Sequence, residues 1–227
     1  MPALLDLLLP TPCAGCRAGR SQLCARCAGV LATLRAGPAG PRPAPGGLPP
    51  LHAAGEYADP VRQLLLAHKE RGAVRLAGPL GRALAGAVRS ALREQGAAGP
   101  VVLVPMPSAR RAVRARGHDA TLRLARAAAR ELRRSGCPAR VAPVLRHNRA
   151  VADQAGLGAE QRRRNLSGAL AVRAARLPPY PLVLVDDLVT AGASLAEAAR
   201  ALRAHGRPPA AAATVAATRR RRGRQPG

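Results

Sequence analysis

The stretch Leu182-Val-Leu-Val-Asp-Asp-Leu-Val-Thr-Ala-Gly-Ala-Ser194 decides the fold class of this 227-residue chain. Its apolar start is typical of a strand that is buried on both faces of a parallel sheet. Two adjacent carboxylates, Asp186 and Asp187, follow the apolar run, and a turn of small residues follows them. Residues 195–205 have a helical pattern. The stretch therefore predicts a strand, a turn and the crossover helix of an α/β domain.

The turn has the chemistry of a phosphate site. In open α/β sheets, ligands lie at the carboxyl ends of strands, where this turn would lie. Gly192 would let the backbone approach a ligand, and the Thr190 and Ser194 hydroxyls with the free helical amides would hold a phosphate. Asp186 and Asp187 would repel a phosphate and suit ribose hydroxyls or Mg²⁺. The stretch predicts a ribose phosphate site; the alternative is a solvated acidic turn after a buried strand.

The rest of the chain alternates between strand and helix patterns. Such alternation favours a parallel or mixed sheet with helices on its faces. Strands are expected at residues 52–57, 101–105 and 210–218, and helices at residues 60–68, 75–94 and 121–134.

Four of the five cysteines form two pairs, Cys13-x-x-Cys16 and Cys24-x-x-Cys27. Each two-residue spacer lets both sulfurs face one ion, and two such pairs complete a closed, structural tetrahedral site. Zinc is the expected metal, and an iron–sulfur cluster is the alternative. Disulfides are not expected in a reducing compartment. The fifth cysteine, Cys137, has no partner in this pattern and is expected to be inert.

A proline- and glycine-rich segment over residues 36–50 divides the chain, because it can form neither a helix nor the interior of a sheet. It predicts a zinc-ribbon module over residues 1–35 and an α/β domain over residues 51–218. Residues 219–227 form a basic tail that we expect to be disordered.

The composition is strongly basic, with 37 Lys and Arg residues against 12 Asp and Glu residues and a formal charge of +25. Such a charge attracts nucleic acid or polyphosphate, although a generally basic surface with no dedicated partner is the alternative. Lys69 is the one lysine, which suggests that its compact ammonium does something that arginine cannot. The chain has two tyrosines and neither Phe nor Trp, so few side chains could stack on bases.

Two further segments complete the pattern. Residues 104–118 leave a strand through two prolines into a dense arginine loop, and residues 145–165 form a long polar stretch. Residues 182–194 resemble the phosphoribosyl pyrophosphate motif of type I phosphoribosyltransferases. With the cysteine pairs and the segment from Tyr57 to Gly72, the chain is similar to the ComF family of competence-associated, phosphoribosyltransferase-like proteins, from Leu5 to about Thr218.

The resemblance implies a type I phosphoribosyltransferase-like sheet after a zinc-ribbon module with four cysteine ligands, with structural Zn and with Mg²⁺ on phosphoribosyl pyrophosphate. It makes Asp186 and Asp187 the catalytic pair. The implied ribose phosphate site comprises Asp186, Asp187, Thr190, Ala191, Gly192, Ala193 and Ser194. The residues expected around the pyrophosphate and in a mobile hood are Lys69, Arg110, Arg111, Gln154, Arg163 and Asn165.

The chain departs from the family pattern after Arg116-Gly117. The family usually has Phe-Asn-Gln there, whereas His118, Asp119 and Ala120 stand in this chain. If the usual Asn and Gln contact a base or an acceptor, their loss puts the identity of the acceptor or the turnover in doubt.

Three functions follow from these patterns. The first is a phosphoribosyltransferase with an unknown acceptor, linked to DNA uptake. The second is a non-catalytic competence adaptor that handles single-stranded DNA beside a helicase or motor protein. The third is a sensor of phosphoribosyl pyrophosphate, because fold does not determine function. No segment approaches the roughly 20 apolar residues of a membrane span, and a cytoplasmic location is expected.

Overall fold

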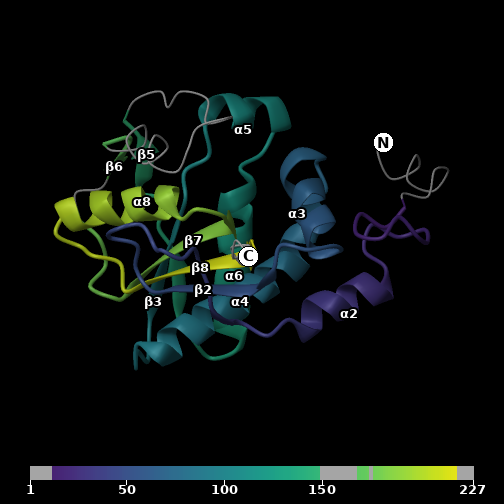
Figure 1. Cartoon of the computed structure of the whole chain (residues 1–227), viewed down its shortest axis with the longest axis horizontal. Coiled ribbons are helices and arrows are strands. Elements are labelled where there is room, and N and C mark those ends of the chain that lie inside the picture. Colours follow the sequence, from purple (N-terminus) through teal and green to yellow (C-terminus); the bar gives the residue numbers. More distant parts are fainter. Residues whose placement is uncertain (1–11, 149–167, 174–175, 219–227) are drawn as a thin grey trace, which may run out of the picture.

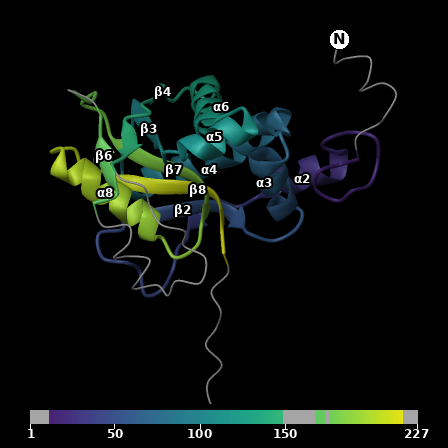
Figure 2. The ribbon, with the colours of Figure 1, turned by 90° about the horizontal axis from the view of Figure 1, so that it is seen from above.

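The computed structural model describes residues 12–148, 168–173 and 176–218, which form a sheet with helices on both faces (Figures 1 and 2). The strands of the main sheet follow the order β1-β2-β8-β7-β3-β4. All neighbours pair in parallel except the edge strand β1, which is antiparallel to β2. The α/β class is therefore confirmed. The strands are β1 (Gly37–Pro38), β2 (Leu51–Glu56), β3 (Val101–Pro105), β4 (Ala139–Val141), β7 (Leu182–Val189) and β8 (Ala211–Ala217).

Helices cover the two faces of the sheet unequally. The helices are α2 (Ala25–Thr33), α3 (Val61–Glu70), α4 (Ala77–Glu94), α5 (Arg110–Arg116), α6 (Ala120–Arg134) and α8 (Ala193–Ala204), with a 3₁₀ turn at Val74–Leu76. Helices α4 and α6 pack together on one face, and α8 covers the other face. Gly81 of α4 permits the close contact with α6, because a Cβ there would collide with Ala127.

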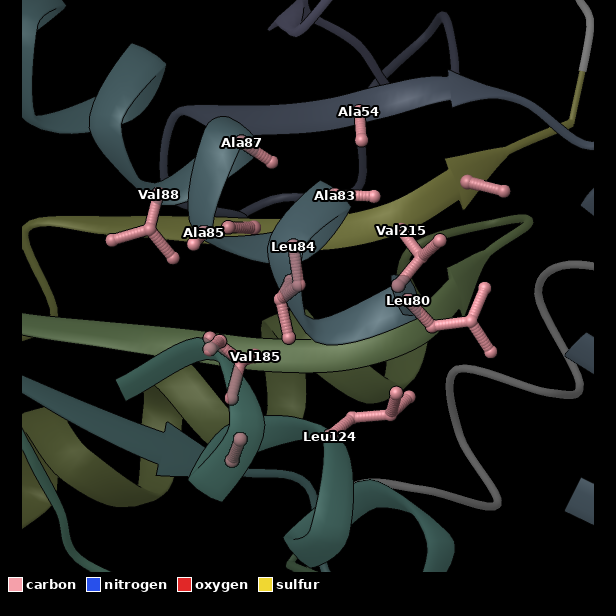
Figure 3. Packing of buried hydrophobic residues seen from close by; sticks show 14 of the residues in the cluster. Ala54, Leu80, Ala83, Leu84, Ala85, Ala87, Val88, Leu124, Val185 and Val215 are labelled. Atoms are coloured by element: carbon pink, nitrogen blue, oxygen red, sulfur yellow. The ribbon is translucent and has the colours of Figure 1, made fainter. Parts of the chain in front are cut away.

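The apolar run of β7 supplies both hydrophobic cores. Val183 and Val185 belong to the cluster formed with α4 and α6, whereas Leu182 and Leu184 belong to the cluster formed with α8. Figure 3 shows Val185 among the buried residues of the first cluster. Neighbouring side chains leave a strand on opposite faces, and both faces are covered. This explains why the run is apolar at every position rather than at every second one.

Strand β7 is longer than the apolar run alone indicates. It continues through Asp186 and Asp187 to Val189, and its register with β8 continues from Val183↔Ala211 to Val189↔Ala217. The carboxylates therefore lie within the last part of the strand rather than after it. The other predicted strands and helices are confirmed to within about two residues at their ends.

The expected arginine loop after β3 is wrong in part, because residues 110–116 form helix α5. Arginine and alanine are both good helix formers. Gly117 ends the helix with a φ of 72°, a conformation that glycine adopts without strain. Asp119 then begins α6, since its side chain accepts a hydrogen bond from the Leu122 amide at 3.0 Å.

The N-terminal segment combines its four cysteines with a helix. The second cysteine pair leads into helix α2, with Cys24 at its N-cap, and residues 12–36 contain no strand. Cys27 and Leu31 of α2 are buried in the same cluster as Leu64 of α3. The segment therefore shares the core of the sheet domain, which supplies the apolar cover that so short a stretch lacks by itself.

The proline- and glycine-rich segment lies against the sheet. It contributes the short edge strand β1, and Leu48 packs on the cluster that includes α8. The prediction that this segment forms no sheet interior stands, because β1 has two residues and lies at the edge.

A separate two-stranded antiparallel sheet joins β5 (Leu145–His147) to β6 (Leu170–Val172). In the sequence, these two strands flank the expected hood, whose residues Gln154 to Asn165 lie outside the described part. Glu197 of α8 is buried and accepts a hydrogen bond from the Leu170 amide at 3.1 Å, so the small sheet is fixed to α8. Within the described residues, no helix has the length and apolarity needed to cross a membrane.

Candidate functional site

A cavity of about 310 Å³, which we name the Asp186 cavity, lies at the carboxyl ends of β3 and β7. Its wall combines segments that are distant in the sequence: the end of α3, the turn after β3, helix α5, strand β6 and the start of α8. Such an edge of a parallel sheet is where α/β proteins bind ligands. The polar residues of its lining are Lys69, Ser108, Arg116, Thr121, His147, Asp186, Ser194 and Glu197.

The two carboxylates of β7 occupy different surroundings. Asp186 lines the cavity, whereas Asp187 is buried and forms an ion pair with Lys69. The Asp187 amide donates a hydrogen bond to Asp186 Oδ1 at 2.8 Å. Burial and the adjacent Asp187 carboxylate raise the pKa of Asp186 well above its ordinary value, and the positive charge of Lys69 opposes this rise in part. Asp186 is thus a destabilised anion that a cation or a hydroxyl donor would relieve.

Lys69 lies between Asp187 and the cavity. Its Nζ donates to Asp187 Oδ1 at 3.2 Å and lies 2.9 Å from Oδ2, and its side chain is 39% exposed. Burial by itself would lower the pKa of Lys69, but the Asp187 and Asp186 carboxylates outweigh burial and raise it. The structure therefore places Lys69, which was predicted to bind a phosphate, beside the two predicted carboxylates. Its positive charge neutralises the carboxylate of Asp187.

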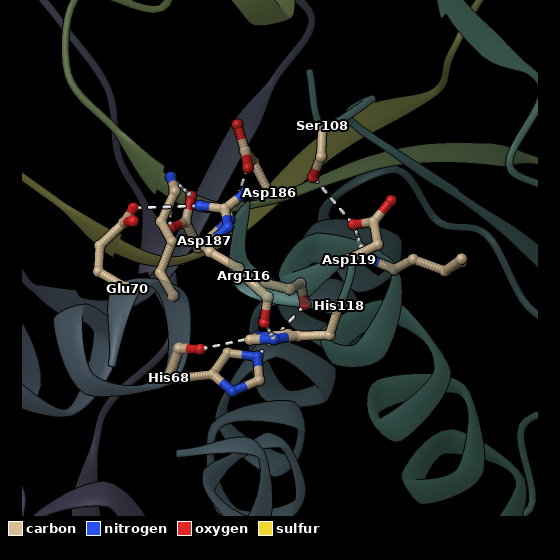
Figure 4. A network of polar contacts seen from close by, with 11 residues as sticks. His68, Glu70, Ser108, Arg116, His118, Asp119, Asp186 and Asp187 are labelled. Atoms are coloured by element: carbon tan, nitrogen blue, oxygen red, sulfur yellow. Dashed lines mark hydrogen bonds and ion pairs between the residues drawn. The ribbon is translucent and has the colours of Figure 1, made fainter. Parts of the chain in front are cut away.

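Arg116 lines the cavity and was not among the residues selected from the sequence. Its Nη1 lies 3.1 Å from Glu70 Oε1, and its side chain is 12% exposed (Figure 4). Its buried Nε has no hydrogen-bond partner in the described part of the chain. An unpaired buried N–H costs about 1–3 kcal/mol, so a ligand oxygen that reached this group would recover that energy. A sequence signal did exist, because Arg116 directly precedes the glycine that ends α5.

The predicted phosphate loop forms the turn between β7 and α8. Ser194 lines the cavity, Thr190 is exposed, and the first turn of α8 has no side-chain cap. Gly192 has a φ of 72°, and a Cβ there would lie 3.2–3.4 Å from side chains of the proline-rich segment. The expected close approach of a ligand to this glycine stays a prediction, and the structure adds a packing reason for the residue. The glycine is required by its backbone angle and by the packing of Leu48, Pro41 and Pro45.

Arg110 and Arg111 lie at the start of α5 and line a second cavity of about 840 Å³ rather than the Asp186 cavity. The two cavities share Met106, Pro107, Ser108, Ala109 and His147. The remaining predicted hood residues, Gln154, Arg163 and Asn165, lie outside the described residues.

The departures at 118 and 119 have structural roles. His118 is buried, and its Nε2 lies 3.1 Å from the His68 carbonyl oxygen while its Nδ1 lies 3.0 Å from that of Arg116. It therefore joins the end of α3 to the turn after α5. Asp119 accepts hydrogen bonds from the Leu122 amide and, at 2.9 Å, from the Ser108 hydroxyl. Both side chains hold the wall of the site in place.

The four predicted metal ligands are gathered at one point. The sulfur atoms of Cys13, Cys16, Cys24 and Cys27 all lie within 4.8 Å of one another, with 3.6 Å between those of Cys16 and Cys24. Tetrahedral zinc with Zn–S bonds of about 2.3 Å requires sulfurs roughly 3.8 Å apart. Burial tends to raise the pKa of Cys13, but backbone amides, the Cys24 N–H first among them, lower it to about 6. The donor set fits a closed structural site for zinc or another thiophilic ion.

Comparison with known proteins adds no assignment. None of the protein-family models matches the chain. A search of the curated proteins finds no significant relative. The function must therefore be inferred from the residues of the site itself.

Proposed function

We propose that this protein is a ComF-like phosphoribosyltransferase that binds phosphoribosyl pyrophosphate with Mg²⁺ and has a role in DNA uptake. One observation carries the proposal. Asp186, Lys69 and Ser194 come from three different elements, β7, α3 and α8, and line one cavity at the carboxyl end of a central strand. A carboxylate, a cation and a hydroxyl at a helix start match the three parts of the ligand: its ribose diol, its pyrophosphate and its terminal phosphate.

In this proposal each group has a separate task. Asp186 accepts hydrogen bonds from the ribose hydroxyls, and the Ser194 hydroxyl with the first amides of α8 holds the terminal phosphate. Arg116 and Lys69 face the departing pyrophosphate, because both line the cavity and carry positive charge. Mg²⁺, which would travel with the substrate, supplies further neutralisation of the pyrophosphate oxygens.

The transfer would proceed by substitution at the anomeric carbon. An N–H or O–H group of the acceptor forms the new bond to C1 as the C1–O bond to pyrophosphate breaks, and pyrophosphate leaves with the electron pair. The acceptor proton passes to the pyrophosphate. Positive charge develops on the ribose ring, close to Asp186, and preorganised charges of this kind are a large term in catalysis. Two buried apolar residues, Leu170 and Met106, line part of the cavity.

Calorimetric titration with phosphoribosyl pyrophosphate and Mg²⁺ tests the proposal. The variant Asp186→Asn/Asp187→Asn is compared with wild type and with Asp59→Asn/Glu131→Gln. The control makes the same change of charge at two acids outside the cavity lining. We expect binding by wild type and control and a loss of at least about tenfold in the site variant, with unchanged metal content.

The result has three outcomes. Binding that survives in the site variant, or that is absent in wild type, contradicts the proposed site. Binding followed by release of pyrophosphate with an acceptor supports transfer. Binding without turnover against any acceptor supports a sensor.

A second candidate function is the handling of single-stranded DNA. It is favoured by the formal charge of +25 and by the exposed arginines of α5 and α6. Its signature is a fall of log affinity with log salt, with a slope near 0.7 per neutralised phosphate. A flat salt response contradicts it.

A further inference from the structure

The second cavity, which we name the arginine cavity, opens beside the Asp186 cavity. It measures about 840 Å³ and lies between the start of α5 and the small β5–β6 sheet. Ligand pockets typically measure about 300–1,000 Å³, so the space is sufficient for a second small molecule. Met106, Pro107, Ser108 and Ala109 belong to both linings, so the two cavities are adjacent.

Four arginines from three segments line this cavity: Arg110, Arg111, Arg146 and Arg173. All four side chains are exposed, and none of them has an ion pair with any residue in the described ranges. Asp119 is the acid among the lining residues of the described structure, and it is occupied as the cap of α6. The cavity therefore carries a net positive charge that its own lining does not neutralise.

Two of these arginines lie where their positive charge destabilises helix α5. Arg110 and Arg111 are the first residues of α5, where the helix dipole favours acidic side chains and disfavours basic ones. Arg146 and Arg173 add two like charges to the same cavity from other parts of the chain. Violations of local preference of this kind are expected at functional sites, where a ligand supplies the compensation.

The positive charge of the cavity suits an anionic ligand, and the remaining lining residues indicate what other groups that ligand contains. Asn148 offers an amide donor and an amide acceptor, which suits the edge of a base. Tyr57 and Tyr180 are not among the lining residues, but planar guanidinium groups can stack on bases. A phosphate-bearing base thus fits this lining better than an uncharged one does.

We propose that the arginine cavity binds the acceptor of the transfer and that this acceptor is a nucleotide, either free or at the end of a single strand. This inference rests on the proposed function. Lys69 and Arg116, which line the Asp186 cavity, are already assigned to phosphoribosyl pyrophosphate. The four additional arginines serve the second reactant, and the shared wall brings that reactant to the anomeric carbon.

The test uses the full chain and three probes: thymidine, thymidine 5′-monophosphate and a 5′-phosphorylated tetrathymidylate. The site variant is Arg146→Gln/Arg173→Gln, which leaves the groups assigned to phosphoribosyl pyrophosphate unchanged. The control, Arg126→Gln/Arg130→Gln, removes the same charge from exposed positions of α6 that do not line the cavity. Calorimetry measures the affinity for each probe and, separately, for phosphoribosyl pyrophosphate with Mg²⁺.

We expect both phosphorylated probes to bind wild type and to lose at least about tenfold in affinity in the site variant. Thymidine should bind more weakly, and the control should stay within about twofold of wild type. Equal affinity for the two phosphorylated probes identifies a free nucleotide. A preference for the tetranucleotide, with a salt slope lower by about 1.4 in the site variant, identifies a strand end.

The inference is overturned if neither phosphorylated probe binds, if thymidine binds equally well, or if the control loses as much affinity as the site variant. Its failure is distinguishable from failure of the proposed function. Loss of nucleotide binding with normal binding of phosphoribosyl pyrophosphate overturns the acceptor site alone. The opposite result overturns the phosphoribosyltransferase assignment and leaves a nucleotide site.

Discussion

Lys69 Nζ lies 2.9 Å from Asp187 Oδ2, although 118 positions of the sequence separate the two residues. The pair joins the end of α3 to the end of β7 at the border of the Asp186 cavity. Asp187 is thereby neutralised, and Asp186 is left as the carboxylate that faces the cavity. The ion pair therefore gives the two adjacent acids different roles: Asp187 is structural, and Asp186 faces the ligand cavity.

Replacement of Lys69 tests this pair. Lys69→Met leaves the buried Asp187 carboxylate without its cation, and we expect a loss of about 1–2 kcal/mol in the free energy of unfolding. This is less than the roughly 3–5 kcal/mol of a fully buried pair, because Lys69 is 39% exposed. Lys69→Arg keeps the charge and should recover most of the stability. Urea denaturation measures both, and a methionine variant as stable as wild type contradicts the pairing.

Asp186→Asn should stabilise the protein and weaken its ligand binding. Burial and the adjacent Asp187 raise the pKa of Asp186 in the folded state. The folded state therefore binds more protons than the unfolded state, and wild-type stability falls as pH rises from about 4 to the folded pKa. Asparagine removes this loss, so we expect a gain of about 1 kcal/mol at neutral pH that vanishes near pH 3. Thermal unfolding of both proteins across pH measures it.

A gain that is independent of pH would contradict the assigned cause. The same shift predicts that the affinity of wild type for Mg²⁺ and phosphoribosyl pyrophosphate rises with pH as Asp186 ionises, after correction for ionisation of the ligand itself.

Arg116→Gln should affect binding more than stability. Its ion-pair partner Glu70 is 52% exposed, so the pair contributes less than about 1 kcal/mol. Its buried Nε, in contrast, has no partner in the described residues and would gain one if a ligand oxygen reached it. We expect the affinity for phosphoribosyl pyrophosphate to fall about tenfold, as measured by calorimetry. Arg114→Gln on the same helix is the matched control. An equal loss of affinity in this control would mean that the overall positive charge, rather than a contact of Arg116, determines binding.

Chelation of a metal held by the four cysteines should unfold more than the N-terminal segment. Cys13, Cys27 and Leu31 share a core with Leu64 and Leu84 of the sheet domain. We therefore expect the whole protein to unfold in a single transition, and we expect chelation to lower the midpoint temperature of that transition by at least about 10 °C. Differential scanning calorimetry measures this. Two separate transitions would show that the segment is an independent module. Cys137→Ser is the control and should retain the metal.

Much of the fold could be predicted from local patterns. The apolar run of residues 182–185 has every position buried because both faces of the sheet are covered, and it predicted a parallel sheet. The end of the strand could not be predicted, because the ladder to β8 continues through two carboxylates. Helix α5 was missed because two prolines precede it and its dense charge suggested a loop, although arginine and alanine are good helix formers.

The candidate site could be predicted in its parts more easily than in its arrangement. The carboxylates and Lys69 were expected and lie together. Arg116 was missed, because nothing in its local sequence beyond the following glycine separates it from the other arginines. Its significance lies in a buried side chain with an unpaired Nε, and burial depends on the packing of α5 against the end of α3.

The sequence by itself determined the α/β class and the cysteine cluster, because both follow from spacing within a short segment. A continuous apolar run along one strand and two-residue spacers between cysteines are translated directly into geometry by the backbone. Only the tertiary structure decided that Lys69 neutralises Asp187, that Arg116 lines the Asp186 cavity, and that four arginines share another cavity. These contacts join residues far apart in the chain, and they depend on how helices and a small sheet pack around one edge of the main sheet.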